Sequence, residues 1–291
     1  MMFERVVVAG VGLIGGSFAL ALKRAGIVSE IVGMGRSRES LQRAMALGIV
    51  DQITDDWSQA LCGAQLVLLG MPVGQMPDVM SAMVPHLSSD TVVTDAGSTK
   101  CDVVAAARSV FGEHLGQFVP GHPIAGAEKS GAEAATANLF DGKRVVLAPL
   151  EENTPEAIAL VASAWTACGA RISQLPAITH DQVFAAVSHL PHLLAFALVH
   201  EFAQRVNADQ LFGFAASGFR DFTRIASSHP EMWRDICLAN RHALLGELDA
   251  YLAELMRARV LIAKADAHGL NDMFDVARTR RNAWLASIDS P

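Results

Sequence analysis

The sequence contains few charged residues, few aromatic residues and no run of basic residues. Charged residues make up 18% of the 291 positions, aromatic residues make up 6%, and the formal net charge is −7. Proteins that bind nucleic acids or anionic membranes present a positive patch, so neither is an expected partner of this chain. An anionic ligand must instead be held by a few well-placed cations. Apolar residues make up 51% of the chain, which is enough for packed cores and too much for a disordered protein.

Cysteine is scarce as well, and no two of the four cysteines have the spacing of a metal or redox motif. We expect them to be small apolar core residues, and we expect no metal site and a cytoplasmic protein. The N-terminus, MMFERVVVAG, places charged residues directly before a strand pattern and is not expected to be a signal peptide. Residues 184–202 are the most apolar later stretch, but they include Ser188 and three histidines. A buried helix is therefore expected there rather than a membrane span.

Short apolar runs alternate with helical patterns over the first part of the chain. We predict strands at residues 5–9, 31–34, 66–70, 91–95, 145–148 and 170–173, and helices at 13–24, 37–47 and 155–168. Such alternation is typical of a doubly wound parallel sheet, so the expected fold class is α/β with an N-terminal Rossmann-like domain. Beyond residue 178 helical spacing dominates, and roughly five or six helices are expected. The predicted domains are residues 1–176, which hold the sheet, and residues 177–291, which are all-helical. The apolar helices of the second domain are expected to pack against a second copy of the chain.

A glycine-rich loop, GVGLIG, starts at Gly10 between the first predicted strand and the first predicted helix. This pattern in this context is typical of dinucleotide-binding folds. Gly10 would allow the tight turn, Gly12 would let a pyrophosphate approach the backbone, and Gly15 would let the helix lie close to the sheet. The helix that starts at Leu13 and Ile14 would offer amide donors and the positive end of its dipole to the phosphates. The alternative is a glycine-rich turn that binds no ligand.

The residues after the second predicted strand favour NADP over NAD as the cofactor. An NAD enzyme usually has an acidic residue there, which binds the ribose 2′-hydroxyl. Here Arg36 and Ser37 take that place, and the nearest acid is Glu39. Arg36 would bind a 2′-phosphate with its forked guanidinium, and Ser37 would add a hydrogen bond. The alternative is that Arg36 and Arg38 are solvated residues before a helix, in which case NAD would serve as well.

Three further loops follow predicted strands and are expected at the carboxyl edge of the sheet, where such folds bind their ligands. Met71 and Pro72 follow one strand and are expected to contact the nucleotide, with a simple strand-ending turn as the alternative. The loops at 95–100 and 121–131 would face the nicotinamide. The second loop holds His122 between a glycine and a proline. A histidine in that place could take a proton from a hydroxyl while hydride leaves the same carbon.

Taken together, these segments resemble the prephenate and arogenate dehydrogenases of tyrosine biosynthesis. The matching segments span nearly the whole chain in the family's order and comprise residues 10–17, 95–100, 121–131, 188–192 and 218–233. The resemblance implies an NADP- or NAD-dependent oxidoreductase that oxidises and decarboxylates prephenate, arogenate or both. Hydride would pass to the cofactor, carbon dioxide would leave, and 4-hydroxyphenylpyruvate or tyrosine would form. The helical domain would bind the substrate and form a homodimer.

The resemblance also implies roles for individual residues. His122 would accept the proton of the substrate hydroxyl, and Ser98 would bond to His122 beside the nicotinamide. The implied substrate-binding residues are Arg224, His192, Trp233 and Glu128. Arg224 would grip a substrate carboxylate, which matches its planar fork. Glu128 would gate the pocket or pair with Arg224.

The first part of the predicted helical domain contains a pair of histidines around a proline. His189 and His192 lie three residues apart and would share one face of a helix. We expect His189 to be a structural hydrogen-bond partner and His192 to line the site. Pro191 should kink the helix and free carbonyl groups near the pocket.

Two other interpretations use the same general architecture. β-Hydroxyacid and imine dehydrogenases also join a Rossmann domain to a helical domain. Many of the former use a lysine on the helix between the domains, but this chain has no lysine between Lys143 and Lys264. A non-catalytic NADP sensor would not need a histidine, a serine and an arginine placed for catalysis. The chain ends at Pro291, so a C-terminal regulatory domain or an added mutase segment is not expected.

Overall fold

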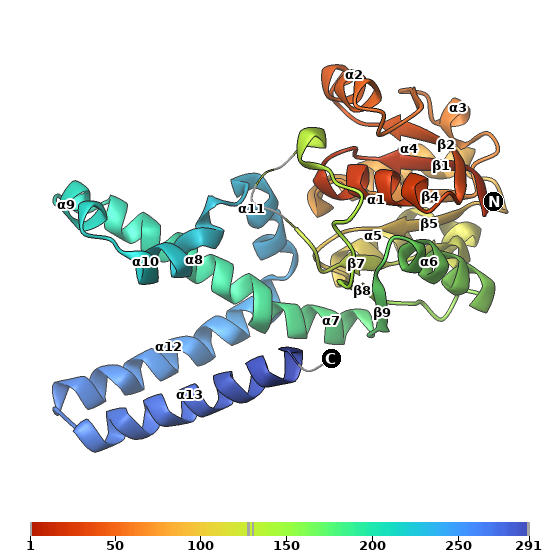
Figure 1. Ribbon diagram of the computed structural model, residues 1–291. Coiled ribbons are helices and arrows are strands. Elements are labelled where there is room, and N and C mark those ends of the chain that lie inside the picture. Colours follow the sequence, from red (N-terminus) through yellow and green to blue (C-terminus); the bar gives the residue numbers. More distant parts are fainter. Residues whose placement is uncertain (1, 127–128, 130, 290–291) are drawn as a thin grey trace. The chain divides into compact units, whose positions relative to one another are not determined.

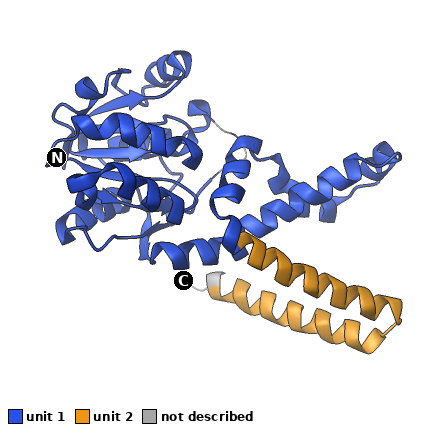
Figure 2. Ribbon diagram, turned by 180° about the vertical axis from the view of Figure 1, so that it is seen from behind, with its two compact units in different colours: residues 1–243 blue, residues 244–291 orange. Residues whose placement is uncertain are grey.

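The computed structural model describes residues 2–126, 129 and 131–289, so the predicted site residue Glu128 lies outside the described residues. The chain forms two compact units, residues 1–243 and residues 244–291 (Figure 2). The first unit contains the sheets and the helices up to residue 243, and it therefore extends past the predicted boundary between residues 176 and 177. The second unit consists of most of α12 (Arg241–Ala263) together with α13 (Ala267–Asp289).

The main sheet has six parallel strands in the order β3-β2-β1-β4-β5-β6 (Figure 1). The strands are β1 (Phe3–Ala9), β2 (Val28–Met34), β3 (Gln52–Ile53), β4 (Leu66–Leu69), β5 (Val92–Asp95) and β6 (Phe118–Val119). β1 pairs with β2 on one side and with β4 on the other, so the strand order reverses at β1. In open sheets of this kind, ligands bind at the carboxyl ends of the strands beside such a reversal. The prediction of a Rossmann-like α/β fold is confirmed.

Helices cover both faces of this sheet, which explains why residues 6–9 of β1 and the whole of β4 are apolar. Along β1, Val6 and Val8 pack into one core, whereas Val7 and Ala9 pack into the other. The first core is covered by α1 (Leu13–Arg24), α2 (Arg38–Ala46) and α6 (Pro155–Ala167), and the second by α3 (Trp57–Leu61), α4 (Met76–Met83) and α5 (Cys101–Val110). Packing on both faces holds the strand ends and the loops after them in fixed positions.

The last three strands do not join the main sheet. β7 (Gly121–Pro123), β8 (Arg144–Leu147) and β9 (Arg171–Gln174) form a separate sheet, in which β7 and β8 are antiparallel. The strands predicted at 145–148 and 170–173 are therefore confirmed, but their expected place in the parallel series is wrong. Pro120 has no amide hydrogen, so the pairing of β6 with β5 ends before it and the chain leaves the main sheet there.

From residue 177 onward the described chain contains helices and no strand, as predicted, although it has seven α-helices rather than five or six. The first is α7 (Ala177–Phe184), and a π-helical turn at Ala185–His189 joins it to α8 (Leu190–Ala203). Pro191 cannot donate to the turn before it, and the widened π turn accommodates the missing bond. The disturbance that the sequence predicts at Pro191 thus takes the form of this π turn. The other helices before α12 are α9 (Ala208–Gly213), α10 (Ser217–Thr223) and α11 (Pro230–Ala239).

One helical segment of the described residues, Ala177–Ala203, is long and apolar enough to cross a membrane by length and composition. Its polar residues indicate a different environment. His180, Asp181 and His189 are buried within the first unit, and each bonds to a residue outside its own helix. Lipid offers no partners to such groups. One face of the N-terminal half of this segment is therefore packed into the first unit.

Candidate active site

The loop from β1 to α1 leaves space above its middle glycine. Gly10 has a φ of +95°, and a Cβ there would lie 2.7 Å from the carbonyl carbon of Gly70. A Cβ on Gly15 would lie 2.2 Å from the carbonyl oxygen of Gly10, so neither position accepts a larger residue. A Cβ on Gly12, by contrast, would meet no atom within 4 Å. Gly12 is the N-cap of α1 and no described side chain caps that helix, so its first amides can bind an anion.

Two neighbouring strands bring further residues to this loop. The amide of Gly10 donates to the carbonyl of Met34, the last residue of β2, at 2.8 Å. A Cβ on Gly10 would also lie 2.8 Å from the amide nitrogen of Met71, so the backbone after β4 lies against the loop. Met71 and Pro72 are partly buried there. The structure thus brings these two predicted residues beside the glycine-rich loop.

The residues after β2 lead into α2. Ser37 is the N-cap of α2, and its hydroxyl accepts a hydrogen bond from the Ser40 amide at 3.2 Å. Arg36 and Arg38 are exposed, and Glu39 lies within the first turn of α2. Two cations and a hydroxyl therefore stand directly after the end of β2, where the sequence analysis places the 2′ end of the nucleotide.

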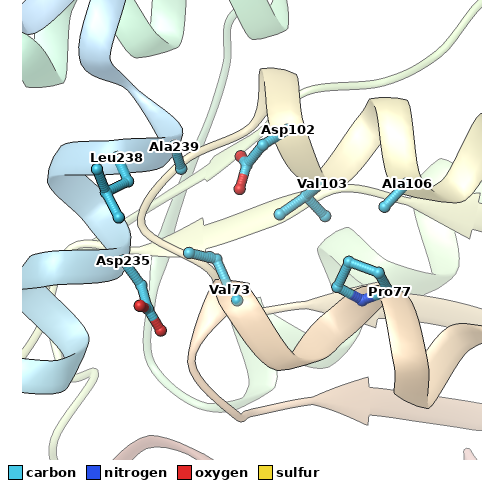
Figure 3. A pocket seen from close by; sticks show the side chains of 9 residues that line it. Val73, Pro77, Asp102, Val103, Ala106, Asp235, Leu238 and Ala239 are labelled. Carbon is cyan, nitrogen blue, oxygen red and sulfur yellow. The ribbon is translucent and has the colours of Figure 1, made fainter.

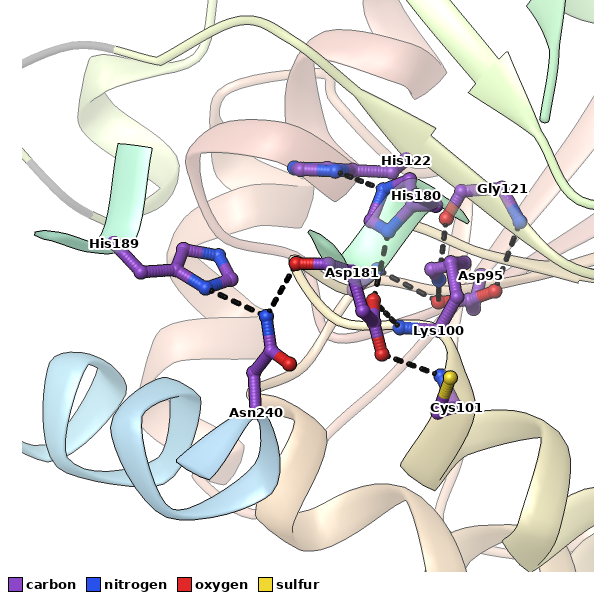
Figure 4. Close-up of polar contacts among 10 residues, drawn as sticks. Asp95, Lys100, Cys101, Gly121, His122, His180, Asp181, His189 and Asn240 are labelled. Atoms are coloured by element: carbon purple, nitrogen blue, oxygen red, sulfur yellow. Dashed lines mark hydrogen bonds and ion pairs between the residues drawn. The ribbon is translucent and has the colours of Figure 1, made fainter. Parts of the chain in front are cut away.

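A buried ion pair fixes the backbone next to His122. Asp95, at the end of β5, pairs with Lys100, and both side chains are 0% exposed. The Asp95 carboxylate also accepts the amides of Gly97, at 2.7 Å, and of Gly121, at 3.0 Å. The Lys100 ammonium donates to the Gly121 carbonyl at 2.7 Å. Both backbone groups of Gly121 are thus held by one ion pair, which positions the next residue, His122 (Figure 4).

His122 bonds to a histidine that the sequence analysis does not single out. Its Nδ1 lies 2.8 Å from Nε2 of His180, and its ring packs against Phe184 with the ring centroids 4.9 Å apart. The expected bond between Ser98 and His122 is not among the hydrogen bonds of the described residues, and His180 takes that place. Burial lowers the pKa of His122 well below its ordinary value, and the charges of His180 and Lys100 lower it further. His122 is therefore neutral near pH 7 and can accept a proton.

Asp181 ties His180 to the start of α5. Its Oδ1 accepts from Nδ1 of His180 and from the Lys100 amide, both at 2.8 Å, and its Oδ2 accepts from the Cys101 amide at 2.8 Å. Burial raises the pKa of Asp181, but the bonds from His180 and from these two amides outweigh it and hold the pKa below its usual value. A signal for this pair was present in the sequence, because an adjacent histidine and aspartate are costly in so apolar a helix unless they are bonded.

Three predicted substrate-binding residues meet on the helices. The ring of His192 stacks on Trp233, with the centroids 3.7 Å apart and the planes at 18°. His192 donates from Nδ1 to the carbonyl of Ser188 at 2.9 Å. Arg224 begins a 3-10 turn, Arg224–Ser227, that packs against α8, the helix of His192. Burial lowers the pKa of His192, and the positive charge of Arg224 lowers it further. Trp233 is buried, and its indole Nε1 has no partner among the described residues.

His189 connects the His180–Asp181 pair, through Asn240, to the stacked pair of His192 and Trp233. Asn240 donates from Nδ2 to the Asp181 carbonyl at 2.7 Å and to Nδ1 of His189 at 3.1 Å. The His189 ring meets Trp233 edge-on, with the centroids 6.2 Å apart. Burial lowers the pKa of His189 to about 4. The structural hydrogen-bonding expected of His189 is observed, and its partner Asn240 was not predicted.

A cavity of about 290 Å³ lies between α4, α5 and α11 (Figure 3). Its wall is mainly apolar, with two carboxylates, and comprises Val73, Gly74, Pro77, Asp102, Val103, Ala106, Asp235, Leu238 and Ala239. Burial raises the pKa of Asp102 in this wall. No predicted substrate-binding residue that the structure describes lines the cavity, so it is separate from the cluster of His192 and Trp233.

The sheet reversal, the open glycine loop and the neutral histidine at the carboxyl edge define a dinucleotide-dependent dehydrogenase that joins a Rossmann domain to helices. Two family models match consecutive parts of the chain. They are the nucleotide-binding domain of prephenate dehydrogenase, over residues 18–174, and its dimerization domain, over residues 176–276. The chain belongs to the prephenate dehydrogenase family.

Relatives of known name or structure cover nearly the whole chain. The cyclohexadienyl dehydrogenase of Zymomonas mobilis is 37% identical over 290 residues, which is 99% of this chain and 98% of that protein. The crystal structure of prephenate dehydrogenase from Aquifex aeolicus in complex with hydroxyphenyl propionate and NAD+ has a TM-score of 0.91 at 35% identity, covering 97% of this chain and 99% of that one. The structure of Synechocystis arogenate dehydrogenase has a TM-score of 0.80 at 30% identity, covering 97% of this chain and 100% of that one. The prediction of a nicotinamide-dependent oxidoreductase of tyrosine biosynthesis is confirmed.

Proposed function

We propose that the chain catalyses the oxidative decarboxylation of prephenate, arogenate or both, and that it prefers NADP as hydride acceptor. One observation carries the proposal. A neutral histidine at the edge of the sheet lies in the same unit as an arginine, a second histidine and a tryptophan from the helices. A Rossmann domain that only bound a nucleotide would not need this second group of side chains.

His122 is the proposed general base. A nicotinamide held at the glycine loop would supply the hydride acceptor for the hydroxyl-bearing ring carbon of the substrate. His122 accepts the proton of that hydroxyl, because its lowered pKa keeps the ring neutral. The bond to the ring carboxylate would break and carbon dioxide would leave, while the electron pair of that bond completes the aromatic ring as a phenolate, which regains a proton from His122 or from water. Ser98, on the loop after β5, is proposed to act beside the nicotinamide rather than through the bond to His122 expected from the sequence.

Arg224, His192 and Trp233 are the proposed substrate-binding residues. A dianionic substrate on a chain of net charge −7 needs a local cation, and Arg224 supplies it beside His192. His192 donates from Nδ1 to Ser188, so Nε2 of the neutral ring is an acceptor, which fits the ammonium group of arogenate, whereas a bond to a substrate carboxylate would need the protonated ring. The buried Trp233 N–H, which has no described partner, can donate one. Glu128 is proposed as a gate or as a partner of Arg224 on the resemblance alone.

The glycine loop and its surroundings form the proposed cofactor site. The pyrophosphate would lie on the loop and on the start of α1, which comprise Gly10, Gly12, Leu13, Ile14 and Gly15. Met71 and Pro72 lie against this loop and would contact the nucleotide. Arg36 and Ser37 would bind a 2′-phosphate, since both stand exposed directly after β2 and the nearest acid in the sequence, Glu39, follows only in the first turn of α2. The Aquifex aeolicus protein was crystallised with NAD+, so the preference for NADP rests on these residues of the present chain.

We further propose that residues 1–176 form the dinucleotide-binding domain and residues 177–291 the substrate-binding and dimerisation domain of a cytoplasmic homodimer. The match to the dimerization domain supports this assembly. Large apolar side chains of the helices are exposed in the single chain, among them Phe214 at 85%, Phe274 at 61% and Trp284 at 55%. Monomers rarely leave so much apolar surface in water.

A four-way initial-rate assay tests the proposed reaction. Prephenate or arogenate is supplied with NAD or NADP, and the absorbance of the reduced nicotinamide is followed. We expect turnover in at least one combination and a higher kcat/KM with NADP. The His122→Asn variant should bind the cofactor normally and lose about 10²- to 10⁴-fold in kcat. Absence of any rate from folded protein that binds NADP would refute the reaction, whereas near-full turnover by His122→Asn would refute only the role of His122.

A further inference from the structure

We infer that His180, held by Asp181, fixes His122 in the tautomer that carries its proton on Nδ1 and leaves Nε2 bare. This inference rests on the proposed role of His122 as the general base. His180 would then be a positioning residue, because it acts on the substrate only through His122. The three side chains form one row from α7 to β7: the Asp181 carboxylate, the His180 ring and the His122 ring, with two contacts of 2.8 Å between them (Figure 4).

The direction of each bond in this row follows from the chemistry of its first member. An ionised carboxylate can only accept hydrogen bonds, so Nδ1 of His180 must donate to Asp181. Burial lowers the pKa of His180, so its ring is neutral near pH 7, and with its hydrogen on Nδ1 it has a lone pair on Nε2. His122 must then donate from its own Nδ1 to that lone pair. A neutral His122 with its hydrogen on Nδ1 has a bare Nε2, which is the nitrogen that can accept the hydroxyl proton.

Asp181, at one end of the row, is held in place by hydrogen bonds from other elements of the first unit. Asp181 accepts the Lys100 and Cys101 amides at the start of α5, and its own carbonyl accepts from Asn240, the C-cap of α11. Asp181 is 4% exposed and His180 is 0% exposed, so neither can turn toward water to find other partners. Because both backbone groups of Gly121 are clamped as well, the two ends of the row are held by different parts of the sheet edge.

This arrangement has a direct consequence for proton transfer. A histidine that can exchange freely between its two neutral tautomers presents a bare Nε2 for only part of the time. His180 removes the unproductive tautomer, since a hydrogen on Nε2 of His122 would leave two lone pairs facing each other across the 2.8 Å contact. After His122 has taken the proton, its Nδ1–H still donates to His180, so the imidazolium keeps its buried partner.

Substitution of His180 separates this role from a merely structural one. Phenylalanine keeps the ring but cannot accept a hydrogen bond, whereas glutamine can present its Oε1 as an acceptor to Nδ1 of His122. We expect kcat to fall at least about 10-fold in His180→Phe, with the KM for substrate and cofactor little changed, and to recover substantially in His180→Gln. The exposed His86 provides the control pair His86→Phe and His86→Gln, which should both resemble the parent protein.

Nitrogen-15 NMR of protein labelled at the histidine rings reads the tautomer directly and needs no turnover. The His122 signals are assigned by their loss in His122→Asn. We expect His122 to carry its hydrogen on Nδ1 in the parent protein and in His180→Gln, and to lose this preference in His180→Phe. A hydrogen on Nε2 in the parent protein would overturn the inference, as would equal kcat values for His180→Phe and His180→Gln in folded protein. If the expected tautomer is found but the four-way assay is silent, the proposed function fails and the tautomer assignment stands.

Discussion

Replacing Lys100 by methionine should destabilise the chain more than any exposed lysine substitution. Asp95 and Lys100 are both 0% exposed, so removal of the ammonium leaves a buried carboxylate whose remaining partners among the described residues are the Gly97 and Gly121 amides. Methionine has a similar length and volume, so little cavity forms and the lost charge dominates. Breaking one side of a buried ion pair typically costs about 3 to 5 kcal/mol. For a large domain, that corresponds to a fall in Tm of roughly 6 to 20 °C.

Thermal unfolding of the ligand-free protein measures this effect. Lys143, which is exposed, provides the matched control, and Lys143→Met should change the free energy of unfolding by no more than about 0.5 kcal/mol. The same variants report on function, because the ion pair clamps Gly121 beside His122. Turnover of Lys100→Met at a temperature where it is folded should therefore be reduced, whereas Lys143→Met should be unaffected.

Two results would refute this reasoning. Equal Tm values for Lys100→Met and Lys143→Met would show that the buried pair contributes nothing to stability. The second test is the double variant Asp95→Asn/Lys100→Met, which removes both charges and should regain part of the lost stability. A double variant less stable than Lys100→Met alone would show that the amide bonds to Asp95, rather than the uncompensated charge, decide the outcome.

Three further predictions concern ligands and pH. Arg224→Gln should raise the KM for substrate with a smaller effect on kcat, and an unchanged KM would place the carboxylate site elsewhere. Arg36→Gln should raise the KM for NADP about 10- to 100-fold and leave that for NAD nearly unchanged, since a hydrogen bond to a charged group contributes about 1.5 to 3 kcal/mol. The third prediction concerns His189, whose ordinary pKa of 6.5 burial lowers to about 4 in the folded chain. Between these values the unfolded chain binds a proton that the folded chain does not. The free energy of unfolding should therefore fall by about 3 kcal/mol as the pH drops through this window, and by less in His189→Asn, whose Oδ1 can still accept from Asn240. Urea unfolding at pH 7 and at acid pH measures the difference, and equal losses in the two proteins would exclude His189 as the cause.

The features that the sequence predicts well are those set by the local backbone. Gly10 and Gly15 stand where a Cβ would collide with main-chain atoms, and the glycine spacing expresses that requirement directly. The apolar strands could be predicted equally well, because burial on both faces of a parallel sheet favours a continuous run of apolar residues. For the same reason, residues 145–148 and 170–173 could be recognised as strands, but their membership of a second sheet could not. A buried strand has the same pattern in either sheet, and Pro120 decides which sheet follows.

His180, the partner of His122, could not be predicted from spacing, because it lies 58 residues away. The helical pattern of the sequence also assigns it to the second predicted domain. Ser98, on a loop at the same edge of the sheet, is an equally reasonable partner until the positions of the helices are known. The His180-Asp181 pair nevertheless needed an explanation, since buried polar groups must be bonded. Its bonds reach α5, β7 and α11, so the first helix after the predicted boundary completes the site at the sheet edge. These bonds explain why the first compact unit continues to residue 243 rather than ending at 176. His122, the proposed general base, is thus held from the helical side by His180 of α7, within the same compact unit as the sheet.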